Sequence, residues 1–128
     1  MEIHFVHKSS TGAYAVLGVL EKEGQTINSS LETLITDSPT SIGINTFNTT
    51  FDLNTMLPLQ TNKYFTYSGS LTTPNMDTTP NQGPLTSIVF KNNITLTVAQ
   101  LDANKLKYVE ENFPLIQPLN NRKVYENY

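Results

Sequence analysis

The run AYAVLGVL, residues 13–20, constrains the fold more than any other stretch, because it contains no charged side chain. A run of about 4–8 apolar residues bounded by turn-forming residues is typical of a strand covered on both faces, whereas a helix needs about ten or more. The segment before it, residues 2–7 (EIHFVH), is rich in β-branched and aromatic residues and predicts another strand. The chain therefore begins with two strands separated by the turn-like residues 8–12.

The rest of the chain predicts further strands and two short helices. We expect strands at residues 63–67, 87–91 and 94–96, helices at residues 28–35 and 97–109, a helical turn within residues 51–58, and an irregular extended tail over residues 112–128. Ser29 and Glu32 have the spacing of a capping box for the first helix. Val98, Leu101 and Leu106 are the expected buried residues of the second helix. The predicted fold class is mixed α/β with β dominant, and 128 residues suit one domain.

The composition excludes several classes of protein. The chain has no cysteine, which rules out disulfides and thiolate metal sites. Its net charge of −3 and its pI near 5.2 argue against a nucleic-acid-binding surface. No apolar stretch reaches the roughly 18 residues of a membrane span, and the first residues do not resemble a signal peptide. We expect a soluble globular protein whose compartment and oligomeric state are unassigned; a leader on an upstream segment would place it in the periplasm or outside the cell.

Metal or acid–base chemistry would depend on the two histidines, His4 and His7. On a regular strand these residues point to opposite faces and do not share one metal ion. A catalytic zinc site usually takes three protein ligands, so the chain does not assemble an all-histidine zinc site by itself. Glu2 lies on the same face as His4, and metal-bound imidazoles usually donate their second N–H to a carboxylate or carbonyl. This favours a role for His4, while two purely structural histidines stay an open alternative.

Residues 69–83, GSLTTPNMDTTPNQG, contain Thr-Thr-Pro-Asn twice, six residues apart. On turn chemistry alone these threonines are ordinary loop residues. The sequence holds no G-x-S-x-G motif, no dinucleotide-binding glycine motif and no phosphate-binding lysine motif. The loop is therefore open to three interpretations: low complexity, an internal duplication, or a functional motif disturbed by an insertion.

Taken in order, the segments resemble the C-terminal half of the α-class carbonic anhydrase family. EIHFVHK resembles the family's Glu-x-His-x-Val-His segment, AVLGVL its next core strand, and YFTYSGSLTTP its Tyr-x-Thr-Tyr-x-Gly-Ser-Leu-Thr-Thr-Pro segment. SIVF, the helix with Gln100-Leu101, and NFPLIQPLNNRKVY follow in the family's order. The resemblance covers nearly the whole chain. It implies a partial domain over residues 1–128, built as the C-terminal half of a central, mostly antiparallel sheet with short peripheral helices.

The resemblance implies reversible hydration of carbon dioxide to bicarbonate by a zinc-bound hydroxide, which forms because zinc lowers the pKa of its bound water to about 7. His4 would be a zinc ligand with Glu2 as its carboxylate partner, and His7 would be a buried structural residue. Thr72 would orient the hydroxide, and Thr73 would lie beside it. The apolar pocket for carbon dioxide would be lined by Val6, Val16, Leu71 and Leu85.

The chain also departs from the family's pattern. The family's other two zinc histidines, its proton-shuttle histidine and its threonine-orienting glutamate would lie upstream of Met1. Ser87 stands about where the family has a tryptophan, and the tail lacks the family's arginine. The loop after Pro74 is longer than the family's, which is explained by a short duplication with Thr78 and Thr79 as the extra copy. We therefore expect little or no hydratase activity from this chain alone.

Two other interpretations stay open. The altered loop and the lost tryptophan favour a carbonic-anhydrase-like protein that serves as a binding or adhesion surface without zinc, whereas the intact Glu2, His4 and Thr72 favour the enzyme. The third interpretation is a complete small β domain with accidental similarity. Half of a larger sheet would leave open edges and exposed apolar faces, which predicts self-association or poor solubility of the chain expressed alone.

Overall fold

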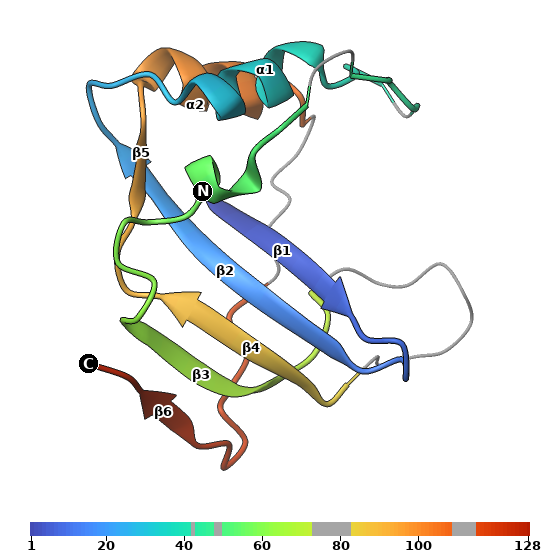
Figure 1. Ribbon diagram of the computed structural model, residues 1–128, viewed down its shortest axis with the longest axis vertical. Helices are drawn as coiled ribbons and strands as arrows, with labels where there is room; N and C mark the ends of the chain where they lie inside the picture. The colour runs from blue at the N-terminus through green and yellow to red at the C-terminus, as the bar shows by residue number, and fades with distance from the viewer. Residues whose placement is uncertain (42, 48–49, 73–82, 109–114) are drawn as a thin grey trace.

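A sheet of six strands dominates the computed structural model, which describes residues 1–41, 43–47, 50–72, 83–108 and 115–128 (Figure 1). The strands are β1 (Glu2–Lys8), β2 (Tyr14–Glu23), β3 (Tyr64–Gly69), β4 (Leu85–Phe90), β5 (Ile94–Leu96) and β6 (Val124–Glu126). Their order is β1-β2-β4-β3-β6, and β5 pairs with the far end of β2. The pairs β1–β2, β3–β4 and β3–β6 are antiparallel, while β4 and β5 run parallel to β2. The predicted β-dominant, mostly antiparallel sheet is confirmed.

The apolar run of residues 13–20 forms the first part of β2, which contacts β1, β4 and β5. Val19 is completely buried, but Leu20, on the other face of the strand, is 40% exposed. The prediction that both faces of this strand are covered is therefore wrong at Leu20. The cause is the position of the helices, which contribute their apolar side chains to only one face of the sheet.

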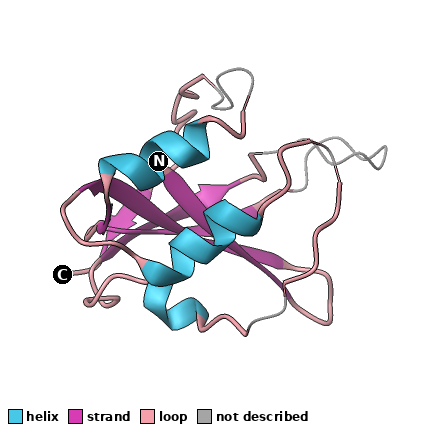
Figure 2. Cartoon of the chain, turned by 90° about the horizontal axis from the view of Figure 1, so that it is seen from above, coloured by secondary structure: helices cyan, strands magenta, loops and turns pink. Residues whose placement is uncertain are grey.

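The core lies between that face and three short helices: α1 (Ser29–Asp37), the 3-10 turn η1 (Leu53–Met56) and α2 (Val98–Lys105). The helices lie across one end of the sheet (Figures 1 and 2). The buried core residues are Val19, Leu31, Ile35, Met56, Phe90, Ile94 and Leu96. Within the described residues no helix is long and apolar enough to cross a membrane.

The first helix begins differently from the prediction. Its N-cap is Asn28, whose side-chain oxygen accepts a hydrogen bond of 3.1 Å from the backbone N–H of Leu31. The predicted capping box on Ser29 is therefore wrong by one residue. Asparagine and serine are about equally good N-caps, so local preference does not decide between them. A tertiary contact favours Asn28, because its backbone is held by the Gln100 side chain.

The second helix buries a polar residue in place of two predicted apolar ones. Leu101 is half-buried, but Val98 is 50% exposed and Leu106 is 86% exposed, so their predicted burial is wrong. Gln100 is only 2% exposed; its Nε2 donates to the Asn28 carbonyl at 2.9 Å, and its Oε1 accepts from the Asn28 N–H at 3.3 Å. A buried amide is stable only when it is hydrogen-bonded, and this contact joins the first turn of α2 to the N-cap of α1.

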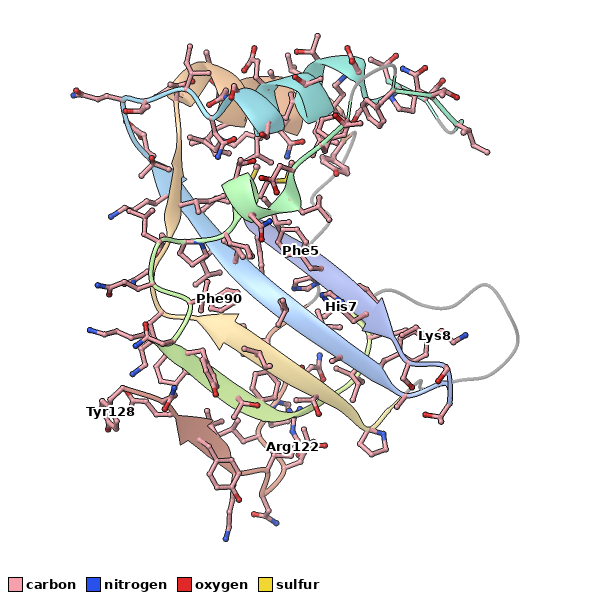
Figure 3. The ribbon with its side chains drawn as sticks, in the orientation of Figure 1. Phe5, His7, Lys8, Phe90, Arg122 and Tyr128 are labelled. Carbon is pink, nitrogen blue, oxygen red and sulfur yellow. The ribbon has the colours of Figure 1, made fainter. Side chains whose placement is uncertain are left out.

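The prediction of an irregular extended tail is wrong for β6, because this strand pairs with β3. Arg122 fixes the approach to this strand: its guanidinium donates to the carbonyls of Leu119 at 2.9 Å, Pro118 at 3.0 Å and Ser68, at the end of β3, at 3.3 Å (Figure 3). All three residues of β6 are exposed, so the strand is held by its pairing rather than by burial.

Candidate functional site

The register of the sheet places five of the predicted site residues on the face opposite the helices: Glu2, His4, Val6, Val16 and Leu85. Two rows cross this face: His4–Gly18–Val89–Phe65 and Val6–Val16–Ser87–Tyr67. Ile3 and Phe5, which alternate with these β1 residues, pack against the core on the other face. The face with the two rows is called the open face, and His4 shares it with the predicted pocket residues Val6, Val16 and Leu85.

Glu2 and His4 form a close pair on the open face. His4 Nε2 lies 3.2 Å from Glu2 Oε1, and the two side chains are 33% and 39% exposed. An ionised carboxylate only accepts hydrogen bonds, so its proximity favours a proton on Nε2. In a neutral imidazole the lone pair is then on Nδ1, which leaves that nitrogen for a ligand.

His7 lies on the opposite face from His4, as predicted, where it pairs with Ala15. It is exposed, however, so the expectation of a buried structural histidine is wrong for this chain. The physical reason is its place near the end of β1 remote from the helices, whereas the core clusters at the helix end (Figure 3).

The predicted pocket residues differ in burial. Val16 is 9% exposed and Leu85 is 4% exposed. These two buried apolar side chains of the open face are called the apolar floor. Leu71 is half-buried just beyond β3, and Val6 is 54% exposed. Register places Val6 beside Val16, but the described residues leave much of Val6 uncovered. The apolar floor is present, whereas a complete enclosure is not formed by these residues.

The threonine pair is only partly described. Thr72 is exposed in a bend that follows β3. Thr73 and the second Thr-Thr-Pro-Asn copy lie outside the described residues. The structure therefore places one of the two predicted catalytic threonines at the end of β3, where Gly69 pairs with Leu85 of the apolar floor.

A complete metal centre is not formed by the described part of the chain, in which no three histidine or acidic side chains gather in a ligand arrangement. His4 is the imidazole donor on the open face, and its contact with Glu2 suits a supported metal ligand. The donor set therefore fits one zinc ligand, with the remaining positions to be filled by other residues.

Two residues of interest were missed from the sequence. Gly18 lies directly opposite His4, and the available signal was a glycine inside a strand, which often marks close approach of another group. Glu21 is 7% exposed on the helix face, and neither carboxylate oxygen has a hydrogen-bond partner among the described residues. Burial raises the pKa of Glu21, and the nearby Met1 ammonium partly opposes that rise.

Comparison with known proteins gives a consistent family. The family described as eukaryotic-type carbonic anhydrase matches residues 1–128. The carbonic anhydrase of Klebsiella pneumoniae is 38% identical over 127 residues, which is 98% of this chain and 49% of the relative. The carbonic anhydrase of Neisseria gonorrhoeae is 35% identical over 126 residues, which is 98% of this chain and 47% of the relative.

Solved structures agree with the sequence relatives. The α-carbonic anhydrase of Thermovibrio ammonificans, solved with the inhibitor sulfanilamide, matches with a TM-score of 0.86 and 35% identity over 96% of this chain and 52% of that protein. A hyperthermostable carbonic anhydrase from a hydrothermal vent chimney matches with a TM-score of 0.84 and 34% identity over 99% of this chain and 54% of that protein. The chain spans about half the length of the curated relatives that it matches.

Proposed function

Because this chain belongs to the eukaryotic-type carbonic anhydrase family, we propose that residues 1–128 form the C-terminal half of a zinc-dependent domain that hydrates carbon dioxide to bicarbonate. The observation that carries the proposal is the Glu2–His4 pair, with 3.2 Å between Oε1 and Nε2, on a sheet face with an apolar floor. Neither histidine nor glutamate is unusual alone; their contact on this face is what suits metal chemistry.

His4 would hold zinc through Nδ1, because Glu2 lies against Nε2. Bound zinc supplies Lewis-acid activation of water, so that a nucleophile exists near neutral pH. The other ligands would come from residues outside these 128. Among the described strands β1 pairs only with β2, so its second edge has backbone groups free to pair with a further ligand-bearing strand.

The substrate side of the proposal rests on the apolar floor and on Thr72. Carbon dioxide is small and apolar, which suits the apolar floor formed by Val16 and Leu85, with Val6 at its edge. Thr72 carries a hydroxyl that would position the reacting water, an effect of orientation rather than of acid strength. Thr73 would stand beside it.

The first test compares this chain with a chimera. We expect the chain alone to bind zinc weakly and to hydrate little or no carbon dioxide. The chimera joins residues 1–128 to the part of the Klebsiella pneumoniae relative upstream of the aligned region. It should hydrate carbon dioxide, and His4→Ala should abolish that activity. Tight one-to-one zinc binding with hydration by the chain alone would contradict the half-domain proposal. A folded chimera without activity or zinc would favour the binding-protein alternative.

The second test asks which threonine copy acts. In the active chimera, Thr72→Ala should lower turnover by about 10²-fold, because misplacing a reactant by about 1 Å has an effect of that size. Thr78→Ala is the matched control and should leave turnover nearly unchanged. The reverse result would assign the site to the second copy. The readout is the initial rate of carbon dioxide hydration at equal zinc content.

A further inference from the structure

Gly18 is placed where a side chain would collide with the Glu2 carboxylate. A Cβ atom built on Gly18 would lie 2.7 Å from Glu2 Oε1 and 3.7 Å from Glu2 Cδ. Real Cβ atoms essentially never approach another heavy atom that closely. Glu2 is diagonal to Gly18 across the β1–β2 pair, because Gly18 pairs directly with His4. The carboxylate therefore lies in the space that every other residue type would fill.

Backbone conformation does not explain this glycine. Among the described residues Gly12 is the glycine with positive φ, at 89°, whereas Gly18 has the extended backbone of β2. Glycine within a strand is unfavourable unless it has a packing reason. The remaining reason is space. A Cβ atom would make only an ordinary contact with Val89 Cγ2, at 3.4 Å, so the group that needs the space is the Glu2 carboxylate, 3.2 Å from His4 Nε2.

We propose that Gly18 is a positioning residue: its missing side chain lets Glu2 lie against His4 Nε2 and so directs Nδ1 of His4 outward as a ligand. This inference rests on the proposed zinc function, to which it adds a third residue. The contacts of Gly18, Glu2 and His4 are all made within this chain. A methyl group at position 18 would displace the Glu2 carboxylate, because strand pairing holds the backbones of β1 and β2 in place and the side chain is free to move.

The experiment uses nuclear magnetic resonance of the metal-free 128-residue chain. The ¹⁵N chemical shifts of the His4 ring report how the proton is shared between Nδ1 and Nε2. We expect Nε2–H alone in the unaltered chain and a mixture of both forms in Gly18→Ala. Glu2→Ala should give the same mixture, and the double variant should be no different, because Gly18 acts only through Glu2.

Gly24→Ala is the matched control. A Cβ atom on Gly24 would lie 2.6 Å from Thr95 Cβ, and Gly24 lies beyond the part of β2 that pairs with Glu2 and His4. This substitution should destabilise the sheet without changing the His4 ring. An unchanged ring in Gly18→Ala, or the same mixture in Gly24→Ala, would overturn the proposal. Should Gly18→Ala not fold, the unaltered chain decides: nuclear Overhauser contacts between the Glu2 side chain and the Gly18 α protons are expected, and their absence overturns the proposal.

A zinc titration of the chimera separates this inference from the proposed function. Removing the support of a metal-bound histidine typically weakens metal binding by about 10–100-fold, and Gly18→Ala should fall in that range. If the chimera binds no zinc at all, the proposed function fails while the ring measurements still stand. If zinc binds equally well with and without Gly18→Ala, the positioning role fails while the proposed function stands.

Discussion

The two faces of the sheet are completed to different degrees by this chain. On the helix face, the apolar residues of β1 to β4 are all buried or half-buried, and Val19 and Leu96 of β2 and β5 are completely buried. On the open face, Val6, Leu20 and Phe65 are 54%, 40% and 39% exposed, next to the buried Val16 and Leu85. The helix face is therefore a closed core, whereas the open face carries the candidate site with part of its apolar side chains exposed.

Side-chain chemistry differs between the faces as well. The open face holds the close Glu2–His4 pair, in which the Glu2 carboxylate lies 3.2 Å from His4 Nε2. The helix face holds Glu21, whose carboxylate is buried without a partner in the part of the chain that the structure describes. A partnered polar pair beside exposed apolar groups is what a binding site requires, whereas an unpartnered buried carboxyl destabilises the fold. The faces can therefore be tested separately by stability and by chemistry.

The largest expected effect on stability separates two leucines. Leu96→Ala should lower the free energy of unfolding by about 2–5 kcal/mol, because it leaves a cavity in a closed core. Leu20→Ala, the matched substitution on the open face, should lower it by less than about 1 kcal/mol in this chain. Urea unfolding measures both. Equal losses would mean that this chain already closes the open face. In the chimera, a larger loss for Leu20→Ala is expected if the upstream half covers it.

The next effect concerns the buried Glu21 carboxyl. Because burial raises its pKa above 4.5, the folded state binds the proton more tightly than the unfolded state, and stability falls as the pH rises through and above that value. Glu21→Leu should therefore raise the free energy of unfolding at pH 7 by about 1–3 kcal/mol, the usual penalty of an unsatisfied buried group. The gain should shrink as the pH falls toward 4.5, because protonation removes the buried charge, but part of it should persist because the neutral carboxyl is still a buried polar group.

Urea unfolding across the pH range measures this prediction. Glu21→Gln removes the charge but keeps a polar group, so it should flatten the pH dependence with a smaller gain at pH 7. An unchanged slope in Glu21→Leu would show that the carboxylate is solvated. That result would remove the contrast between an unpartnered group on the helix face and a partnered pair on the open face.

Local sequence patterns predicted the elements whose stability is local. The apolar run of β2, the strand period of β1 and the helical period of α1 are each visible within about ten residues. The elements missed depend on distant partners. Gln100 is buried because it bonds Asn28, 72 residues away in sequence, and β6 exists because β3 offers an edge. Neither partner is visible in a local window.

The candidate site follows the same division. The spacing of Glu2 and His4 predicted their common face, since side chains alternate along a strand. The neighbourhood of Val6 and Val16 needed the family resemblance, because the register between strands is not a property of either strand. Gly18 was missed for the same reason: its space matters only once β1 is laid against β2.

The smallest effect is expected at Glu126 of β6, which lies on the open face beside Phe65. The hydrogen bonds from Lys91 and Tyr128 lower the pKa of Glu126 below 4.5. The Lys91 ammonium also lies over two aromatic rings, 5.1 Å from the centroid of Phe65 and 4.5 Å from the centroid of Tyr128. Since the folded-state pKa is lowered, the carboxylate contributes stability above pH 4.5 and loses it as the pH falls.

Glu126→Gln should therefore loosen β6 slightly at pH 7, and this effect should shrink as the pH falls below 4.5; its sign is opposite to that of Glu21→Leu. Hydrogen exchange of the Asn127 N–H, which donates to the Tyr64 carbonyl at 2.9 Å, measures this directly. Because the pair is exposed, the global unfolding midpoint should change little. A loss of unfolding free energy as large as that of Leu96→Ala would contradict this prediction. It would mean that β6 belongs to the stable core, so that the open face would extend no further than β4.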